Sequence, residues 1–441
     1  MAKDVQMRWV SDDIEKIQTK TNLYLVNYGN AGAFHLFREV FQNSVDELCD
    51  TNSNGKKIYT SYDRVTGEIT VDDDGRGIPE TDQPLEITIT KLQAGSKFMR
   101  EDSKSSGEFG IGITLTVALS KSFSITCFRE EEKTAHTIKF EEGKKVEDRV
   151  TANNSGRHGT LVKFIPSKKY LGADTEFPFE DAKNWINDLM YLPMDNDKIK
   201  IKYELLKDGV AEESFTFKKK EFDELLDTRD SKDSDKGLLS QRLYITGSER
   251  VPEEIAGKVY NKELRLDVAL SYSIDPEVTL PEYNSWCNFT QTTEGGVHVE
   301  AVEKCFCSYM QNHIRQGLSD AQKDKFPITW DDIRSGLVVF LNVATSAQVR
   351  FVGNMKQKIG NERLNPIIYR ICYREMDKFF STHPSVYDAY AKMIKANCKA
   401  RIELQKAKAA TQTERMNNLK EHSLKNYIPC INRGNRYREL N

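Results

Sequence analysis

The sequence predicts an α+β protein made of two mixed domains and a long C-terminal helix. Helix-like and strand-like patterns of apolar residues alternate through about the first 385 residues. The stretch from Tyr387 to Leu424 is rich in Ala, Lys, Glu and Gln and lacks Gly and Pro, which favours one long helix. A chain of 441 residues is also too long for one ordinary core. We expect domains over 1–225 and 226–385, then a helix and linker over 386–441.

The first domain is predicted to contain an amphipathic helix over about 34–49. Its apolar side chains recur at spacings of three and four, at Phe34, Phe37, Val40, Phe41, Val45 and Leu48. Strands are expected over 58–62, 68–71, 122–128 and 160–165. A Gly/Ser-rich loop over 94–113 precedes a short buried helix over 114–119.

The second domain is predicted from strands over 264–272 and 336–343 and a helix over 297–316. Cys305 and Cys307 fall within that helix. Since no C-x-x-C or H-E-x-x-H spacing occurs, we expect reduced thiols and no zinc site. The hydrophilic stretch from Lys218 to Lys236 is the best candidate for a linker or an exposed insertion.

Composition and charge are those of a soluble globular protein, with 38% hydrophobic and 30% charged residues and a net charge of −3, and the lack of membrane and export signals predicts the cytoplasm. No stretch approaches the roughly 20 apolar residues of a membrane span, and the N-terminus lacks the apolar run of a signal peptide. From Val386 onward, seven Lys and five Arg face one Asp and four Glu. This basic segment suits either a neighbouring nucleic acid or an ordinary solvated helix.

The first motif that could carry chemistry lies on the early helix. Glu39, Asn43 and the pair Asp46 and Glu47 follow helical spacing and share one face. A carboxylate one turn from an amide oxygen can orient water beside a divalent cation. Polar helix faces with Glu and Asn are common, so a plain solvated face is the alternative.

The second motif, Asp72-Asp73-Asp74-Gly75-Arg76-Gly77-Ile78-Pro79, directly follows a predicted strand. Glycines at such an edge let the backbone approach a ligand closely. A carboxylate there could accept a hydrogen bond from the exocyclic amine of a purine. A polar hairpin turn is the alternative.

The third motif, Gly107-Glu-Phe-Gly110-Ile111-Gly112, opens a predicted helix. Its glycines allow successive backbone N–H groups to face a phosphate, and Lys97 could add a phosphate contact. The spacing is neither that of a P-loop nor that of a dinucleotide-binding Rossmann turn. A flexible loop is the alternative.

These motifs, followed by Gly159-Thr160 entering a strand, occur in order within about 130 residues. Together they resemble the GHKL (Bergerat) ATP-binding fold of gyrase, the Hsp90 chaperones, histidine kinases and MutL, a mixed sheet with helices on one face. The resemblance implies that Glu39 is the general base, that Asn43 holds Mg²⁺ and that Asp73 binds adenine. It places the other nucleotide-binding positions at Asp46, Glu47, Arg76, Gly77, Ile78, Pro79, Lys97, Thr160, Lys358 and a lid comprising Gly107, Gly110, Ile111 and Gly112.

Four segments resemble the gyrase B and topoisomerase II branch in particular. Asn43-Ser-Val-Asp-Glu47 and the segment 73–79 are nearly identical to that branch, and Glu294-Gly-Gly-Val-His298 is similar to a motif near the start of its transducer domain, which has a ribosomal-protein-S5-like α/β fold. The loop 350–361 is similar to the transducer loop, in which Lys356 takes the place of a lysine that reaches the γ-phosphate. Phosphoryl transfer needs positive charge there. A surface lysine is the alternative.

Several positions depart from the usual family pattern. Asn354-Met355-Lys356 stands for Gln-Thr-Lys, Gly95-Ser96 for a glycine pair, and Glu108-Phe109 for Leu-His. The usual Pro-Gly-Met-Tyr-Ile-Gly near the start reads differently over 22–26. These differences bear on nucleotide affinity and inhibitor sensitivity, and they suggest a phage or other unusual source.

The predicted function is that of the ATPase clamp of a type IIA DNA topoisomerase, which dimerises on ATP binding and captures double-stranded DNA. No Glu-Gly-Asp-Ser segment of a Toprim domain occurs, so we expect no DNA cleavage centre and a partner subunit or further domains that supply one. A chaperone-like or MutL-like clamp on a protein partner is the alternative. A histidine kinase is disfavoured because no membrane span or phospho-accepting helix is found. A catalytically dead binding module is disfavoured because Glu39, Asn43, Asp73 and Lys356 occur together.

Overall fold

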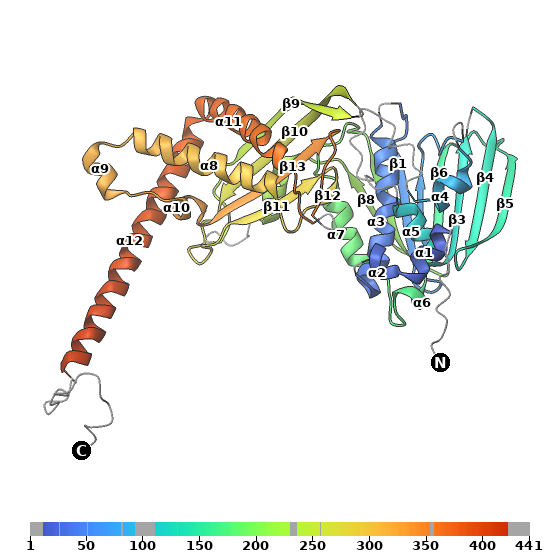
Figure 1. The fold of residues 1–441 in the computed structure, drawn as a ribbon, viewed down its shortest axis with the longest axis horizontal. Coiled ribbons are helices and arrows are strands. Elements are labelled where there is room, and N and C mark those ends of the chain that lie inside the picture. Colours follow the sequence, from blue (N-terminus) through green and yellow to red (C-terminus); the bar gives the residue numbers. More distant parts are fainter. Residues whose placement is uncertain are drawn as a thin grey trace, which may run out of the picture. The chain divides into compact units, whose positions relative to one another are not determined.

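The protein is described by a computed structural model over residues 12–25, 27–50, 52–80, 83–92, 111–129, 131–229, 236–255, 257–352 and 357–421. The chain groups into two compact units, 1–306 with 336–386 and 307–335 with 387–441. The first unit contains two β-sheets, and the second consists of helices (Figure 1). The domain boundaries expected at 225 and 385 stay a prediction.

The first sheet has eight strands in the order β5-β4-β3-β6-β2-β1-β7-β8. The strands are β1 Lys57–Asp63, β2 Ile69–Asp73, β3 Ser120–Arg129, β4 Thr134–Glu141, β5 Lys144–Ala152, β6 Gly159–Pro166, β7 Lys200–Lys207 and β8 Val210–Lys218. β1 and β7 are parallel, and the other neighbours are antiparallel. The sheet is therefore mixed, as predicted.

Helix α3, Gly29–Leu48, packs on β1, β2 and β6, and α5, Gly112–Ala118, packs on α3 and β3. Apart from Phe34, which is half-buried, the apolar stripe predicted for α3 is buried, and the rings of Phe37 and Phe41 lie 6.1 and 5.4 Å from that of Trp185. Burial of this stripe against the sheet fixes the opposite, polar face of α3 in the site described below. The other helices here are α1 Asp13–Thr19, α2 Thr21–Tyr24, α4 Leu85–Thr90, α6 Lys168–Leu171 and α7 Phe179–Leu189.

The second sheet has five strands in the order β12-β11-β13-β10-β9, and β11 and β13 are parallel. The elements of this region are β9 Leu243–Ile255, β10 Lys258–Tyr272, β11 Glu282–Cys287, β12 Thr290–Gln291, β13 Leu337–Thr345, α8 Val297–Gln316, η3 Glu362–Leu364 and α11 Asn365–Thr382. α11 packs on β9 and β10. Two mixed sheets with separate helices confirm the predicted α+β class.

One expectation about the connection between the sheets is wrong in part. Within the hydrophilic stretch 218–236, η2 Phe222–Arg229 forms a 3₁₀ helix that contacts β10. Phe222, Leu225 and Leu226 are buried, so this part is packed structure and no exposed linker. Residues 230–235 lie outside the described residues.

In the second unit, α9 Asp320–Lys325 and α10 Trp330–Arg334 accompany the long helix α12 Pro384–Glu421. Arg401 of α12 binds Asp332 with Nε–Oδ1 and Nη2–Oδ2 distances of 2.7 and 2.9 Å. Asn397 donates to the carbonyls of Asp332 and Ser335, at 3.0 Å each. These bonds anchor the predicted long helix. Over the described ranges, no helix has the length and apolar character that a membrane crossing requires.

Candidate active site

Asp73 is the last residue of β2, and its side chain is held by three donors. Ser44 Oγ donates to Oδ2 at 2.8 Å, while the backbone N–H groups of Gly75 and Thr160 donate to Oδ1 at 3.0 and 3.2 Å. The residue is only 5% exposed. A carboxylate has about four acceptor positions, so one position on Oδ2 is left for a further donor.

Burial raises the pKa of Asp73 to about 7, and the negative charge of Glu47 acts in the same direction. The bonds from Ser44, Gly75 and Thr160 oppose the shift because they favour the ionised form. The carboxylate is therefore closer to neutrality than an exposed aspartate. A perturbed carboxyl with an open acceptor position is suited to binding a ligand amine.

Two glycines allow the backbone to crowd around this carboxylate. Gly159 has a φ of 110°, and a Cβ there would lie 1.9 Å from the carbonyl oxygen of Asp73. Gly77 has a φ of 75°, and a Cβ there would lie 2.9 Å from the carbonyl oxygen of Phe128. Any side chain at either position would force these backbones apart.

The segment after β2, residues 76–80, is hereafter called the strap. Its first residue, Arg76, is bound to α3 through Glu47, with Nε–Oε1 and Nη2–Oε2 distances of 2.7 and 2.9 Å. The backbone N–H of Arg76 also donates to Glu47 Oε1 at 3.0 Å, and Asp50 lies 3.2 Å from Nη2. The predicted residues Glu47 and Arg76 thus fix the strap to the helix.

Glu39 lies on α3 one turn before Asn43 and faces the start of α5. A Cβ on Gly112 would lie 2.0 Å from Glu39 Oε2 and 2.9 Å from Glu39 Cβ. The imidazole Nε2 of His35 lies 3.8 Å from Glu39 Oε1. The Glu39 side chain is 17% exposed, so it keeps access to water while its position is restricted by α5.

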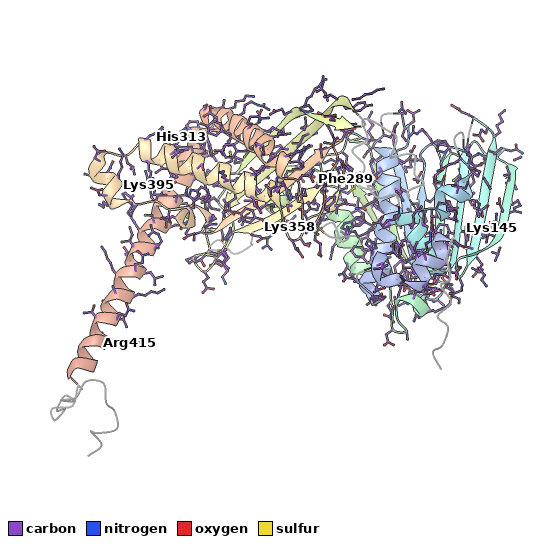
Figure 2. All side chains as sticks on the ribbon, in the orientation of Figure 1. Lys145, Phe289, His313, Lys358, Lys395 and Arg415 are labelled. Atoms are coloured by element: carbon purple, nitrogen blue, oxygen red, sulfur yellow. The ribbon has the colours of Figure 1, made fainter. Side chains whose placement is uncertain are left out.

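In the second-sheet region, Gly295 and Gly296 pack against the segment 357–360. Gly296 has a φ of 128°, and a Cβ there would lie 2.3 Å from the carbonyl oxygen of Ile359. Ile359 N donates to the carbonyl of Gly295 at 3.1 Å. Lys358, labelled in Figure 2, is half-buried, and its carbonyl accepts from Val352 N at 2.8 Å. The Gly-Gly motif thus fixes the end of the predicted transducer loop.

The structure brings together most of the described positions that the sequence indicated. Asp73, Gly77, Ile78, Pro79 and the backbone of Thr160 surround the end of β2. Helix α3 carries Glu39, Asn43, Asp46 and Glu47, and helix α5 begins at Gly112, directly after Ile111. Lys97, Gly107, Gly110 and Lys356 lie outside the described residues.

Other residues were not predicted from the sequence. Ser44 binds Asp73 directly, and Arg157 Nη2 binds Asp72 Oδ1 at 2.6 Å while stacking 4.1 Å from the centre of the Phe128 ring. Arg129 Nε donates to the strap carbonyl of Ile78 at 3.2 Å. Ser44 is adjacent to Asn43 in the motif, which was a usable signal, whereas nothing local pairs the two arginines with their partners.

Comparisons with known proteins agree with this geometry. Residues 30–160 match the family described as histidine kinase-, DNA gyrase B- and HSP90-like ATPase, and residues 221–410 match the family described as DNA gyrase B. The DNA gyrase B protein of Campylobacter jejuni is 28% identical over 92% of this chain and 49% of that protein. The DNA gyrase B protein of Thermotoga maritima is 26% identical over 93% of this chain and 61% of that protein. The chain thus spans about half to three-fifths of these relatives.

Solved structures with the same fold include the 43K ATPase domain of Thermus thermophilus gyrase B in complex with an aminocoumarin. It superposes with a TM-score of 0.67 at 21% identity, over 90% of this chain and 98% of that one. The ATPase region of Saccharomyces cerevisiae topoisomerase II superposes with a TM-score of 0.59 at 16% identity, over 88% and 100%. At these identities the likeness establishes the fold.

Proposed function

Because this chain matches the ATPase and transducer region of type IIA DNA topoisomerases in sequence and in fold, we propose that it is an ATP-driven clamp. In this proposal the chain binds ATP and Mg²⁺, dimerises through its ATP-binding domain and closes on a segment of double-stranded DNA. Hydrolysis then reopens the clamp and drives strand passage.

The observation that carries the proposal is the arrangement around Asp73. Its carboxylate keeps an open acceptor position in a buried setting, beside a strap whose Gly77 packs closely on the backbone carbonyls of Phe128 and Gly159. The 6-amino group of adenine is a donor of the required kind. The same helix that holds Asp73 through Ser44 also carries Glu39 and Asn43, so one element positions all three groups.

The residues fit the chemistry of hydrolysis. Glu39 would act as the general base toward a water molecule. Asn43 would hold Mg²⁺, since amide and carboxylate oxygens are the ligands that this hard cation prefers. Bound Mg²⁺ neutralises phosphate charge. Lys356 and Lys358 would bring positive charge from the transducer loop toward the γ-phosphate. Gly295 and Gly296 would fix the end of that loop.

We further propose a division into an ATP-binding domain over 1–225, a transducer domain over 226–385 and a helical segment over 386–441. The partner is a DNA-cleaving topoisomerase subunit or further domains, and the compartment is the cytoplasm. A chaperone-like clamp is less well supported because the gyrase B family matches 221–410, a region outside the shared ATPase fold.

The test is Mg²⁺-dependent ATP hydrolysis by the chain and by Glu39→Ala, with binding of a non-hydrolysable ATP analogue measured for both. Glu403→Ala, which removes an exposed carboxylate of α12, is the matched control. We expect hydrolysis to fall at least about 100-fold in Glu39→Ala, in line with the loss of a general base, while analogue binding and dimerisation persist. A wild-type chain that binds no analogue, or hydrolysis that continues at the same rate without Glu39, would refute the assignment.

A further inference from the structure

A second set of contacts holds the far end of the strap, at Glu80. The guanidinium of Arg129 forms an ion pair with Glu80 and donates from Nε to the carbonyl of Ile78 at 3.2 Å. His136 of β4 lies behind Glu80, with its Nδ1 2.5 Å from Glu80 Oε1. Its other nitrogen, Nε2, lies 2.9 Å from Oδ1 of Asp148 on β5. His136 therefore joins the strap to the outer strands of the sheet.

The geometry determines the charge of His136. A neutral imidazole has one N–H donor and one nitrogen acceptor, and a carboxylate can only accept. Both nitrogens face carboxylate oxygens, and Arg129 forms an ion pair with the same Glu80 oxygen that faces Nδ1. Only the imidazolium, with two donors, satisfies both bonds. Burial of the ring lowers the pKa of His136, but the bonds to Asp148 and Glu80 outweigh burial and raise it above the ordinary value.

Protonation of His136 brings the neighbouring charges closer to balance. Lys145 of β5, labelled in Figure 2, binds Asp148 at 3.0 Å and Glu86 of α4 at 2.7 Å, and Arg129 also binds Glu132 at 2.9 Å. The charged groups that face this cluster are the cations Arg129, His136 and Lys145 and the anions Glu80, Glu86, Glu132 and Asp148. Removal of the His136 proton would leave two cations among four carboxylates.

We propose that His136 is a positioning residue for the nucleotide site, which as an imidazolium holds the strap in place through Glu80, and whose deprotonation at alkaline pH weakens nucleotide binding. The inference rests on the proposed function, because the strap is taken to line the adenine pocket. Its physical basis is that one end of the strap is fixed to α3 by Arg76 and the other end to β4 by His136. Loss of the second anchor leaves Arg129 as the remaining cation on Glu80.

The sign of the effect follows from linkage. A histidine whose pKa is raised in the ordered state stabilises that state below its ordinary pKa, near 6.5, and the stabilisation is lost as the pH rises through the raised value. If binding raises the pKa of His136 by a further unit, affinity falls about tenfold across the transition. Asp73 acts in the opposite direction, because its ionised carboxylate is the stronger acceptor for the adenine amine and its pKa is about 7.

The experiment is calorimetric binding of a non-hydrolysable ATP analogue between pH 5.5 and 9. The wild type should show affinity that rises and then falls with pH. His136→Gln should lose the alkaline decline, up to about tenfold, and keep the acid limb of Asp73. Asp148→Asn retains the imidazole with one carboxylate fewer and should shift the decline to lower pH. Glu147→Gln is the control and should resemble the wild type. Glu147 is next to Asp148 on β5, but it forms its ion pair with Lys139 of β4.

A second readout needs no nucleotide. The imidazole proton signal that disappears in His136→Gln should titrate above pH 6.5 in the free wild type and at lower pH in Asp148→Asn. An alkaline decline of equal size in the wild type and His136→Gln, or a His136 signal that titrates below 6.5, would overturn the inference. Absence of analogue binding at every pH, with the His136 titration as expected, would instead refute the proposed function. Thermal unfolding of each variant separates these outcomes from a failure to fold.

Discussion

The contact between Gly112 and Glu39 gives a sharp test of the catalytic assignment. In Gly112→Ala, the new Cβ would start 2.0 Å from Glu39 Oε2. Non-bonded carbon contacts are favourable near 3.5 Å, so the carboxylate must move by more than about 1 Å. Glu39 Cβ would lie only 2.9 Å away, and rotation of the side chain cannot relieve that contact. A displacement of about 1 Å in a reacting group can cost roughly 100-fold in rate.

We therefore expect kcat for ATP hydrolysis to fall about 100-fold in Gly112→Ala, with a much smaller loss of analogue affinity. Helix propensity acts in the opposite direction, since alanine is favoured over glycine in a helix by about 0.5–1 kcal/mol. Gly317→Ala is the matched control, because a Cβ there would meet only ordinary contacts at 3.6 and 3.7 Å. Unchanged hydrolysis in Gly112→Ala would refute the role given to Glu39. An equal loss of binding and rate would assign Gly112 to binding alone.

Three further predictions concern other parts of the molecule. Asp73→Asn keeps an oxygen for the two backbone donors, so it should fold, yet bind the analogue about 10- to 100-fold more weakly in calorimetry. It should also unfold at higher temperature at pH 8, because an acid whose pKa is raised to about 7 destabilises the fold above its unfolded value. Gly296→Ala, with its Cβ 2.3 Å from Ile359 O, should lower kcat more than analogue affinity by displacing the end of the transducer loop. Arg401→Ala should lower the free energy of unfolding by about 1–3 kcal/mol through loss of its bonds to buried Asp332. The pKa of Asp332 is lowered in the folded protein. The wild type, unlike the variant, should therefore lose the contribution of this ion pair to the free energy of unfolding below pH 3.8, as measured by acid unfolding.

Elements with a strong apolar pattern could be predicted from the sequence. Strands that lack such a pattern, and are defined by backbone hydrogen bonds to a neighbouring strand, could not. The stripe of α3 indicated a helix from residue 34, but the helix begins at Gly29. Its first turns were missed because they contain Gly29 and Gly32, and glycine has a low helix propensity. Gly32 is required there, since a Cβ would lie 2.8 Å from the carbonyl of Asn27. β5 was not predicted because nearly all its side chains are exposed and charged residues mask any alternation. Its backbone bonds to β4 define the strand instead.

The candidate site shows the same division. Asp73 and Gly77 could be assigned because each stands in a short motif whose spacing has a direct geometrical meaning. The partners that hold Asp73 and the strap come from distant positions in the chain. Ser44 lies 29 residues from Asp73, and His136 lies 56 residues from Glu80, at the end of the strap. No local pattern encodes such pairs, since they arise only when α3, β2 and β4 are packed into one layer structure.

A buried polar contact connects the second sheet to the helix of the proposed catalytic residues. Gln42, next to Asn43 on α3, donates from Nε2 to the carbonyl of Phe289 at 3.4 Å, and both residues are buried. Phe289 follows Asn288 in the turn between β11 and β12, where the φ values of 44° and 65° are left-handed, a conformation that is unfavourable for Phe and better tolerated by Asn. The Asn288 side chain offsets this cost by bonding the backbone N and O of Thr345 at 2.8 and 2.9 Å. The end of β13 therefore fixes the turn, and the turn fixes the position of a carbonyl that α3 contacts one residue from its proposed Mg²⁺ ligand.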